Sequence, residues 1–324
     1  MTGFVVSRLL RAALTLLLIV SLAFVVLRAS GDPALLILSV DAPAEAIEAF
    51  RKAWGLDQPL WLQYLHYLRA VATGDLGQSM LDGRPAVDVV FERIPATLMI
   101  TVPALVMKLA IGLPAGIHAA LHRDAAGDRV TMAAAMIGHA MPSFVFALLL
   151  VLVFSVELGW LPSAGSGAGS GAGLEDWRHA VMPVVTLGVA GAAAVARFSR
   201  SAMIEVLGRP YIRTASAKGL VWRRVVRDHA LPNAAIPTVT LLGFLLGGLI
   251  AGAVVVETVF AWPGIGRLMV TAVANRDLAV VQTILLLAGA TMVAANLAID
   301  LAYGWLDPRI RRAGGAGSLI EDPS

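Results

Sequence analysis

The 324-residue chain contains no cysteine. This absence excludes disulfides, thiolate metal sites and cysteine nucleophiles. Charge is also scarce, because only 15% of the residues are charged, whereas soluble domains carry about 25%. The sequence has no Gly-x-x-x-x-Gly-Lys-Ser/Thr, no His-Glu-x-x-His and no Gly-x-Ser-x-Gly, and its six histidines lack ligand spacing. We therefore expect no ATP-binding loop, metal site, cofactor or catalytic group in this chain, and predict that it is not an enzyme.

Apolar residues dominate instead. They make up 58% of the chain and gather in runs of about 20 residues, the length that crosses a hydrocarbon core about 30 Å thick. The sequence predicts an all-α integral membrane protein with six spans, over residues 9–27, 94–118, 132–156, 181–196, 236–256 and 280–301. Internal prolines are compatible with these spans, because transmembrane helices tolerate proline when neighbouring groups satisfy the freed carbonyls. The fourth span is short, and its glycines and alanines suit close helix packing.

The placement of Lys and Arg predicts the orientation. If the N-terminus lies inside, basic residues are more frequent in the cytoplasmic segments than in the outer ones, as the positive-inside rule requires. The first apolar run follows Arg8 and Arg11 and resembles a signal peptide, but Leu27-Arg28-Ala29 is a poor cleavage site. We therefore expect an uncleaved first span and both termini in the cytoplasm.

The chain divides into four regions. Residues 1–28 are the N-terminal tail and first span, 29–93 an outer helical segment, 94–305 the transmembrane core with a cytoplasmic loop at 197–235, and 306–324 a cytoplasmic tail. In the outer segment, apolar spacing predicts one helix over 44–54 and a second from Pro59, whose Trp61 and Tyr64 favour the membrane interface. A tight turn follows over 74–79. The Gly/Ser/Ala-rich stretch 163–173 predicts a flexible outer linker.

Ionisable residues inside the spans are the next candidates for function, because they usually mark a pathway or a pair. Lys108, His139 and Asp300 fall there. Snorkelling or pairing inside the bundle is favoured for Lys108, and packing between helices for His139. Carriers driven by ion gradients usually have several acidic groups near the midplane, whereas Asp300 is a single carboxylate near the cytoplasmic end of its span. The energy for transport must therefore come from elsewhere.

A basic stretch, residues 197–233, supplies an alternative. It holds 8 of the chain's 25 Lys and Arg residues. The pattern predicts a helix over 211–217 ended by Gly219, because glycine readily accepts the left-handed conformation at a helix end. A second helical stretch over 221–230 meets Leu231-Pro232, where proline stops or redirects it. A loop that only sets topology would explain the arginines, but it would not explain this framework of glycine and proline as easily.

This stretch resembles a known motif. Permeases of ABC importers carry Glu-Ala-Ala-x3-Gly-x9-Ile-x-Leu-Pro, and Arg213-Thr214-Ala215-x3-Gly219-x9-His229-x-Leu231-Pro232 keeps its spacing, with Arg for Glu, Thr for Ala and His for Ile. The variant is similar to that of the dipeptide/oligopeptide/nickel branch. Further segments that resemble this branch are Gly74–Ser79 (GDLGQS), 93–98 (RIPATL), 141–144 (MPSF), 159–162 (GWLP), 257–266 (ETVFAWPGIG) and 306–311 (LDPRIR). The resemblance runs from about Arg8 to Arg312.

The resemblance implies the six-helix membrane domain of a type I ABC importer in the bacterial inner membrane, of the first-permease kind with a long outer segment after span one. Such a subunit forms half of a pore with a second homologous permease. Two cytosolic ATPases drive it, a solute-binding protein outside the membrane delivers substrate, lipid surrounds it, and no nucleic acid takes part. Peptides are the expected substrate, with nickel chelates, glutathione or oligosaccharides as alternatives. An ion-coupled secondary transporter and a channel or structural membrane protein are the rival classes.

The resemblance also implies two sites. The coupling helix and turn that contact the ATPase would contain Arg213, Thr214, Ala215, Ser216, Ala217, Lys218 and Gly219, and the second arm Leu231, Pro232 and Asn233. An outer gate that meets the binding protein would contain Trp262, Pro263, Gly264 and Gly266. The alternative for the outer loop is an ordinary interfacial turn anchored by Trp262.

Overall fold

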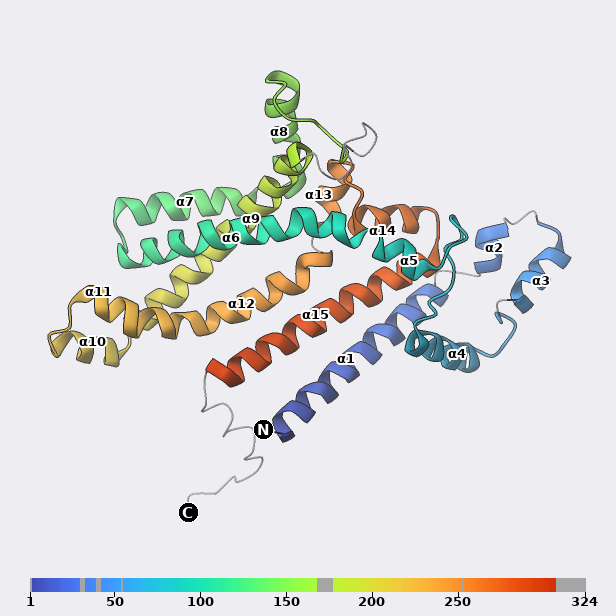
Figure 1. The fold of residues 1–324 in the computed structure, drawn as a ribbon, viewed down its shortest axis with the longest axis horizontal. Helices are drawn as coiled ribbons and strands as arrows, with labels where there is room; N and C mark the ends of the chain where they lie inside the picture. The colour runs from blue at the N-terminus through green and yellow to red at the C-terminus, as the bar shows by residue number, and fades with distance from the viewer. Residues whose placement is uncertain are drawn as a thin grey trace, which may run out of the picture.

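The computed structural model describes residues 2–29, 33–38, 42–53, 55–167, 177–251 and 253–306, and helices make up most of them. Figure 1 shows long helices running side by side, with shorter helices at both ends. In chain order the helices are α1 (Thr2–Ala29), α2 (Pro33–Leu38), α3 (Ala44–Ala53), α4 (Leu60–Thr73), α5 (Ala86–Phe91), α6 (Ile94–Leu121), α7 (Ala126–Ala140), α8 (Ser143–Leu150), η1 (Val151–Glu157), α9 (Trp177–Leu207), α10 (Pro210–Ala217), α11 (Trp222–Arg224), η3 (Val225–Ala230), α12 (Leu231–Ala251), α13 (Val254–Val259), α14 (Ile265–Ala274) and α15 (Leu278–Leu306). The two η elements are π-helical.

Within the described residues, 5 segments are long and apolar enough to cross a membrane, and there are up to 6 if a bent pair counts as one span. The five are Val6–Val25, Ala86–Leu121, Trp177–Leu207, Trp222–Val259 and Leu278–Ile299. The start of α1, the end of α15 and the α10–α11 region lie toward one end of the bundle, whereas α2, α3, α4 and α14 lie toward the other (Figure 1). This arrangement places the basic stretch and the start of the chain on the same, cytoplasmic, side.

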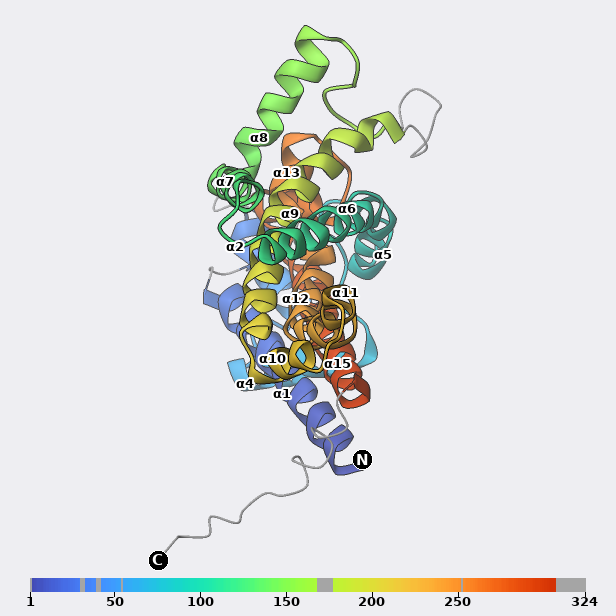
Figure 2. The ribbon, with the colours of Figure 1, turned by 90° about the vertical axis from the view of Figure 1, so that its left-hand side faces the viewer.

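The third predicted span, residues 132–156, corresponds to the bent pair and is not a straight helix. The helix axis turns by 94° between Ala126–Gly138 and Ser143–Glu157. Met141 (φ −76°, ψ 121°) and Pro142 (φ −56°, ψ 135°) are extended, because proline excludes the helical region for the residue before it. As a result α7 packs beside α6 and α9, whereas α8 packs against α9 and α13. In Figure 2 the segment that begins with α8 extends to the top of the molecule.

Small residues bring α6 and α9 into close contact, as the sequence predicts. A Cβ atom added to Gly112 would lie 2.6 Å from the Val195 Cβ and 2.7 Å from the Ala192 carbonyl oxygen. Gly191 likewise gives room to the stem of Lys108, whose Cδ would lie 2.5 Å from an added Cβ. Packing of the Lys108 stem across α9 therefore explains how the bundle holds a lysine. The fourth span is much longer than 181–196, since α9 runs from Trp177 to Leu207.

The outer segment is packed onto the ends of α1 and α15. Tyr64 of α4 contacts α1 through a 2.5 Å hydrogen bond between its hydroxyl and Ser21 Oγ, and the Phe24 ring lies 5.3 Å from the Tyr64 ring. Buried Asp277, just before α15, accepts hydrogen bonds from Ser79 Oγ (2.5 Å) and Met80 N (3.2 Å). The second outer helix is confirmed. The predicted turn at 74–79 is only the end of α4 at Gly74, whereas the chain reverses between Ser79 and Arg84, where the Ser79 amide donates a 2.8 Å hydrogen bond to the Arg84 carbonyl oxygen. The first, α3, ends at Ala53, and the predicted last residue, Trp54, lies outside the described residues.

The first residues of the predicted flexible linker, 163–167, pack against the rest of the protein. The Gly165 amide donates a 2.8 Å hydrogen bond to the Phe260 carbonyl oxygen, and Ser166 is buried. Residues 168–176 lie outside the described residues. The part of the stretch that the structure describes is therefore held against the end of α13. Gly165 (φ +81°) and Gly167 (φ +77°) take up left-handed conformations that glycine accepts readily.

Candidate coupling surface and outer hairpin

Residues 208–230 form a compact cytoplasmic knob between α9 and α12. Pro210 begins α10 at a position where its missing amide hydrogen costs nothing. The helix ends at Ala217, and Gly219 has φ +81°, the left-handed conformation that side chains disfavour. The predicted helix and its glycine ending are thus confirmed. Arg197 to Leu207 belong to α9 and residues after 230 to α12, so the predicted loop at 197–235 is shorter than expected.

One face of the knob is apolar and buried. Ile212 and Ala215 of α10 pack with Met203 of α9 and with Val225 and Val226 of η3. Ala120 of α6 and Ala230 and Ala234 complete this cluster. The cluster therefore joins α10 to the ends of three long helices, α6, α9 and α12.

The opposite face of α10 carries most of the predicted coupling residues into solvent. Arg213, Thr214, Ser216, Ala217, Lys218 and Gly219 are exposed, whereas Ala215 faces inward. In the second arm Pro232 and Asn233 are exposed and Leu231 packs partly against the buried cluster. The Asn233 side-chain amide donates a 2.7 Å hydrogen bond to the His229 carbonyl oxygen. Both arms therefore pack against the same buried cluster.

The sequence predicted that Pro232 stops or redirects the second arm. Instead, Pro232 lies in the first turn of α12. The Leu231 amide donates to the Val226 carbonyl oxygen five residues earlier, the pattern of a π-helix. Proline cannot donate to the carbonyl four residues earlier, and its ring crowds that carbonyl. The wider turn of η3 accommodates this, and the helix continues without a break.

Two exposed apolar residues of the knob were missed by the sequence analysis. Val221 is 68% exposed and Trp222 is 51% exposed, and they lie directly before exposed Arg223 and Arg224. Tyr211 on α10 is also exposed. Trp, Tyr and Arg are the residues enriched at the centres of protein interfaces. The sequence signal that could have indicated this surface is a tryptophan, Trp222, within a basic cytoplasmic segment.

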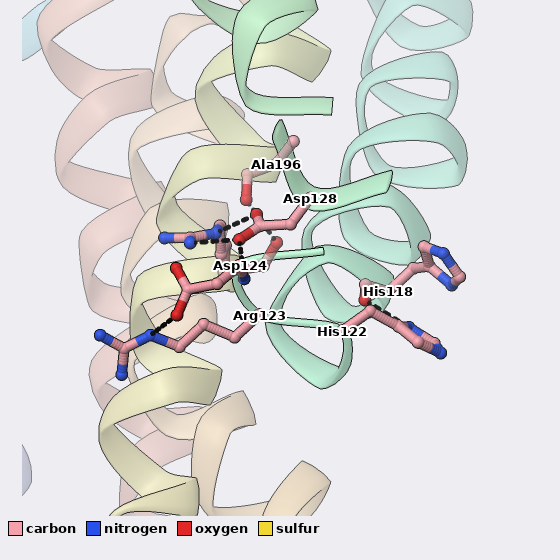
Figure 3. A network of polar contacts seen from close by, with 8 residues as sticks. His118, His122, Arg123, Asp124, Asp128 and Ala196 are labelled. Atoms are coloured by element: carbon pink, nitrogen blue, oxygen red, sulfur yellow. Dashed lines mark hydrogen bonds and ion pairs between the residues drawn. The ribbon is translucent and has the colours of Figure 1, made fainter. Parts of the chain in front are cut away.

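Not every arginine of the basic stretch is free to meet a partner. Arg200 of α9 donates from Nε and Nη2 to the two carboxylate oxygens of Asp128, each at 2.6 Å, and Asp128 is almost fully buried. Asp128 also accepts a 3.0 Å hydrogen bond from the Asp124 amide, and Figure 3 shows Asp124 and Asp128 together at the turn after α6. The imidazoles of His118 and His122, whose rings are tilted by 35° with centroids 4.3 Å apart, lie to one side of this network. This network fixes the α6–α7 turn to α9.

The outer hairpin, residues 254–274, consists of α13, α14 and the loop between them. Glu257 is completely buried. Its Oε1 accepts from Thr97 Oγ1 at 2.8 Å, and its Oε2 accepts from the Arg267 amide at 3.0 Å. Thr97 Oγ1 in turn accepts from the Ile265 amide at 2.8 Å. A carboxylate therefore sits at the N-terminal end of α14, where it satisfies free amides and favours the helix dipole.

The two glycines near the start of α14 are required by close contacts with α13. A Cβ atom at Gly264 would lie 2.5 Å from Glu257 Oε2, and one at Gly266 would lie 2.5 Å from the Val254 Cα. Trp262 is completely buried and its Nε1 donates a 2.7 Å hydrogen bond to the Ala96 carbonyl oxygen. Trp262 is thus not an interfacial anchor. A binding protein cannot reach its side chain or the two glycines in this conformation, although Pro263 is partly exposed.

Comparisons with known proteins agree on one family. A model described as "Binding-protein-dependent transport system inner membrane component" matches residues 112–312, and the corresponding N-terminal model matches residues 1–101. The glutathione transport system permease protein GsiC of Escherichia coli strain K12 is 42% identical over 312 residues, covering 96% of this chain and 99% of that protein. GsiC of Shigella dysenteriae is equally similar. A solved structure of the MetNI methionine ABC transporter in an inward-facing conformation is similar in fold, with TM-score 0.56, 21% identity and coverage of 68% of this chain and 96% of that chain.

Proposed function

Because the chain belongs to the family of binding-protein-dependent transport system inner membrane components, we propose that its cytoplasmic knob is the surface through which ATPase subunits drive transport. The chain is a permease subunit of an ABC importer in the inner membrane, and in this family the ATPase activity lies in separate subunits. The knob is well suited to receive force. Its outer face exposes Arg213, Lys218 and Trp222, and its inner face is joined to three long helices.

In the proposed cycle, ATP binding closes two ATPases and moves the knobs of this chain and of a second homologous permease together. The two permeases then exchange inward- and outward-facing arrangements around a central pathway, as a shift of population between two states. The Gly219 turn and the buried cluster below α10 keep the knob in one orientation, so that displacement at its surface reaches α9 and α12. An ion-coupled carrier is disfavoured because the predicted spans hold a single carboxylate, Asp300, near the cytoplasmic end of its span. Glu257, just beyond the fifth predicted span, already accepts hydrogen bonds within the chain.

The outer hairpin is proposed to act as the gate below a solute-binding protein. Burial of Trp262, Gly264 and Gly266 makes them the internal frame of this gate rather than its contact surface. The exposed residue beside them is Arg267, which is therefore a better probe of contact than Gly264. A cysteine at Arg267 that crosslinks to the binding protein supports the gate, and a failure to crosslink in any nucleotide state argues for an ordinary turn.

For the substrate we propose a small peptide. The support is the likeness to a glutathione permease, since glutathione is itself a tripeptide. The alternatives are glutathione as the specific substrate, nickel chelates and oligosaccharides. The test is uptake of labelled glutathione by the complete transporter with its binding protein, in competition with unlabelled dipeptide, tripeptide, nickel–histidine chelate or oligosaccharide. Competition by peptides alone supports the proposal, and competition by the chelate or the sugar alone contradicts it.

The absence of cysteine makes the knob directly testable. A single cysteine at exposed Ala217 should react with a Cys–Lys crosslinker and join the ATPase subunit in the purified complex. Ala125, which is also exposed at the cytoplasmic end but lies in the α6–α7 turn, is the matched control. Crosslinking at Ala217 and not at Ala125 supports docking at the knob. Equal crosslinking at both, or none at Ala217 in a complex that copurifies with its ATPase, contradicts it.

A further inference from the structure

Lys108 lies near the middle of α6, far from both ends of that helix. At a rise of 1.5 Å per residue, it is about 20 Å from Ile94 and about 20 Å from Leu121, where the helix begins and ends. A lysine side chain reaches only about 6 Å from its Cα atom. Its ammonium therefore cannot snorkel to either membrane surface, and it needs a counter-charge or water at this depth.

The side chain of Lys108 is directed into the bundle. Val102 and Val106 mark the exposed face of α6, at 43% and 60% exposure. Lys108 comes two residues after Val106, which is about 200° around the helix, and so it lies on the opposite face. Its stem crosses α9 at Gly191, where an added Cβ atom would lie 2.4 Å from the Lys108 Cε. The ammonium is one bond beyond Cε and is thereby held at the crossing of α6 and α9.

No carboxylate of the described chain neutralises this ammonium. Among the described residues Lys108 forms no ion pair and no hydrogen bond, and α6 and α12 contain no Asp or Glu. On α9, Glu205 is about 20 Å beyond Gly191 along the helix and pairs with Arg209. Arg197 of α9 adds a further positive charge, and its Nε is buried without a hydrogen-bond partner. The crossing of α6 and α9 is therefore positively charged and suits a carboxylate from outside the chain.

We propose that Lys108 binds a carboxylate of the transported solute in the middle of the translocation pathway. The inference rests on the proposed function, in which this chain forms half of that pathway. An ammonium offers three donors on a flexible stem, which suits a carboxylate that binds in passing. Peptides, including glutathione, and nickel–histidine chelates have carboxylates, whereas neutral oligosaccharides have none. Lys108 therefore narrows the substrate to a solute that carries a carboxylate.

The position of Lys108 also relates this site to the knob. Ala120, near the end of α6, and Met203 of α9 both belong to the buried cluster below α10. The two helices that hold Lys108 are therefore the same helices that the cluster joins to the coupling surface. A carboxylate bound at their crossing would be released or exposed as the two helices move.

The first test uses the absence of cysteine from the chain. In the complete transporter in proteoliposomes, Lys108→Cys should react with a negatively charged, membrane-impermeant thiol reagent in at least one nucleotide state, because the pathway brings water to this position. Val106→Cys, at nearly the same depth on the opposite face of α6, is the matched control. It should not react, because only the thiolate is nucleophilic and a thiol in apolar surroundings stays protonated. The product is read from the mass of this chain.

The second test is the maximal rate of ATP-dependent uptake of labelled glutathione at saturating binding protein. Lys108→Met keeps the length of the side chain and removes its charge. It should lower this rate about tenfold or more, the size expected for one lost hydrogen bond to a charged group. Lys108→Arg, which keeps the charge, should retain more of the rate, and Val106→Met should leave it unchanged. The same binding protein is used throughout, so a lower rate arises in the membrane subunits.

Four results would overturn the proposal. Labelling of Lys108→Cys in no nucleotide state, or no faster than Val106→Cys, would show that water does not reach this position through a pathway. Loss of the second permease from the purified Lys108→Met complex would assign the ammonium to a carboxylate of that subunit. Normal glutathione uptake by Lys108→Met would overturn this assignment alone and leave the proposed function standing. Absence of ATP-dependent glutathione uptake by the wild-type transporter would overturn the proposed substrate, and this assignment with it.

Discussion

Glu257 allows the sharpest test of how the outer hairpin is held. Its carboxylate accepts hydrogen bonds from the Thr97 hydroxyl and from the Arg267 amide, and it also accepts from the Gly266 amide. Glu257→Gln keeps the size and shape of the side chain. If the glutamine side-chain amide orients its oxygen toward the backbone amides of Gly266 and Arg267, it can still accept their hydrogen bonds. The bonds then lose their charge, and the difference between charged and neutral hydrogen bonds predicts a loss of about 1–2 kcal/mol in hairpin stability.

Glu257→Ala should cost far more. It leaves the two backbone amides and the Thr97 hydroxyl without their buried acceptor, at about 1–3 kcal/mol for each unsatisfied group, and it opens a cavity beside Gly264. We therefore expect a loss of at least about 3 kcal/mol. The exposed carboxylate Glu157 is the control, and Glu157→Gln should change stability by less than about 0.5 kcal/mol.

The assay is amide hydrogen exchange of residues 264–268 together with thermal unfolding of the purified chain. A loss of 1–2 kcal/mol speeds exchange about 5–30-fold if the hairpin opens locally. Exchange should increase from wild type to Glu257→Gln to Glu257→Ala at these amides, while the core of α6 keeps its protection. Unchanged exchange in Glu257→Ala would refute the view that this carboxylate holds α14.

Three further predictions follow from other contacts. Gly112→Ala should lower thermal stability by about 1–3 kcal/mol, because its Cβ would overlap α9, while Gly248→Ala, which meets nothing within 4 Å, should not; equal effects would contradict the close packing. Asp277→Asn should weaken the bonds from Ser79 and the next amide, so that limited proteolysis cuts near the 74–85 turn faster; an unchanged cleavage rate would argue against this anchor. Trp222→Ala should weaken ATPase binding about tenfold or more, measured by titration of the purified subunits, without changing thermal stability, because the side chain is half exposed; normal affinity would remove Trp222 from the interface.

Local chemistry made much of this fold predictable. Apolar runs predict five spans, and a sixth if the bent pair counts as one, because crossing a bilayer requires a minimum length. The sequence of α10 and Gly219 likewise specifies where that helix ends. Long-range contacts were not predictable in this way. Trp262 was expected at an outer gate or, as the alternative, at the membrane interface, but its side chain is buried and its hydrogen bond goes to Ala96, which lies 166 residues earlier in the sequence.

The prolines illustrate the same limit. Pro103 and Pro114 lie inside α6 and Pro183 inside α9, whereas Pro142 separates two helices at a bend of 94°. The residue type is the same in each case. Whether the helix continues depends on which neighbouring groups satisfy the freed carbonyls, and those groups come from other parts of the chain. Pro232 is compatible with a continuous helix because the π-helical turn before it is wider.

The central claim is that the knob transmits the work of ATP hydrolysis, and Gly219 tests it most directly. Its φ of +81° is disfavoured for other residues, but an added Cβ would meet nothing within 4 Å. Gly219→Val therefore destabilises the conformation of the turn alone, by at least about 1–2 kcal/mol. Asparagine is tolerated better than valine in this conformation, so Gly219→Asn is the milder variant. Gly208→Ala, at the other end of the knob, is the control because Gly208 does not have a positive φ.

The decisive measurement is the number of substrate molecules taken up per ATP hydrolysed by the complete transporter in proteoliposomes. The account predicts a ratio that falls about 5–30-fold in Gly219→Val, falls less in Gly219→Asn, and stays normal in Gly208→Ala, with equal membrane insertion of all variants. A normal ratio in Gly219→Val would contradict the claim that force enters through this knob.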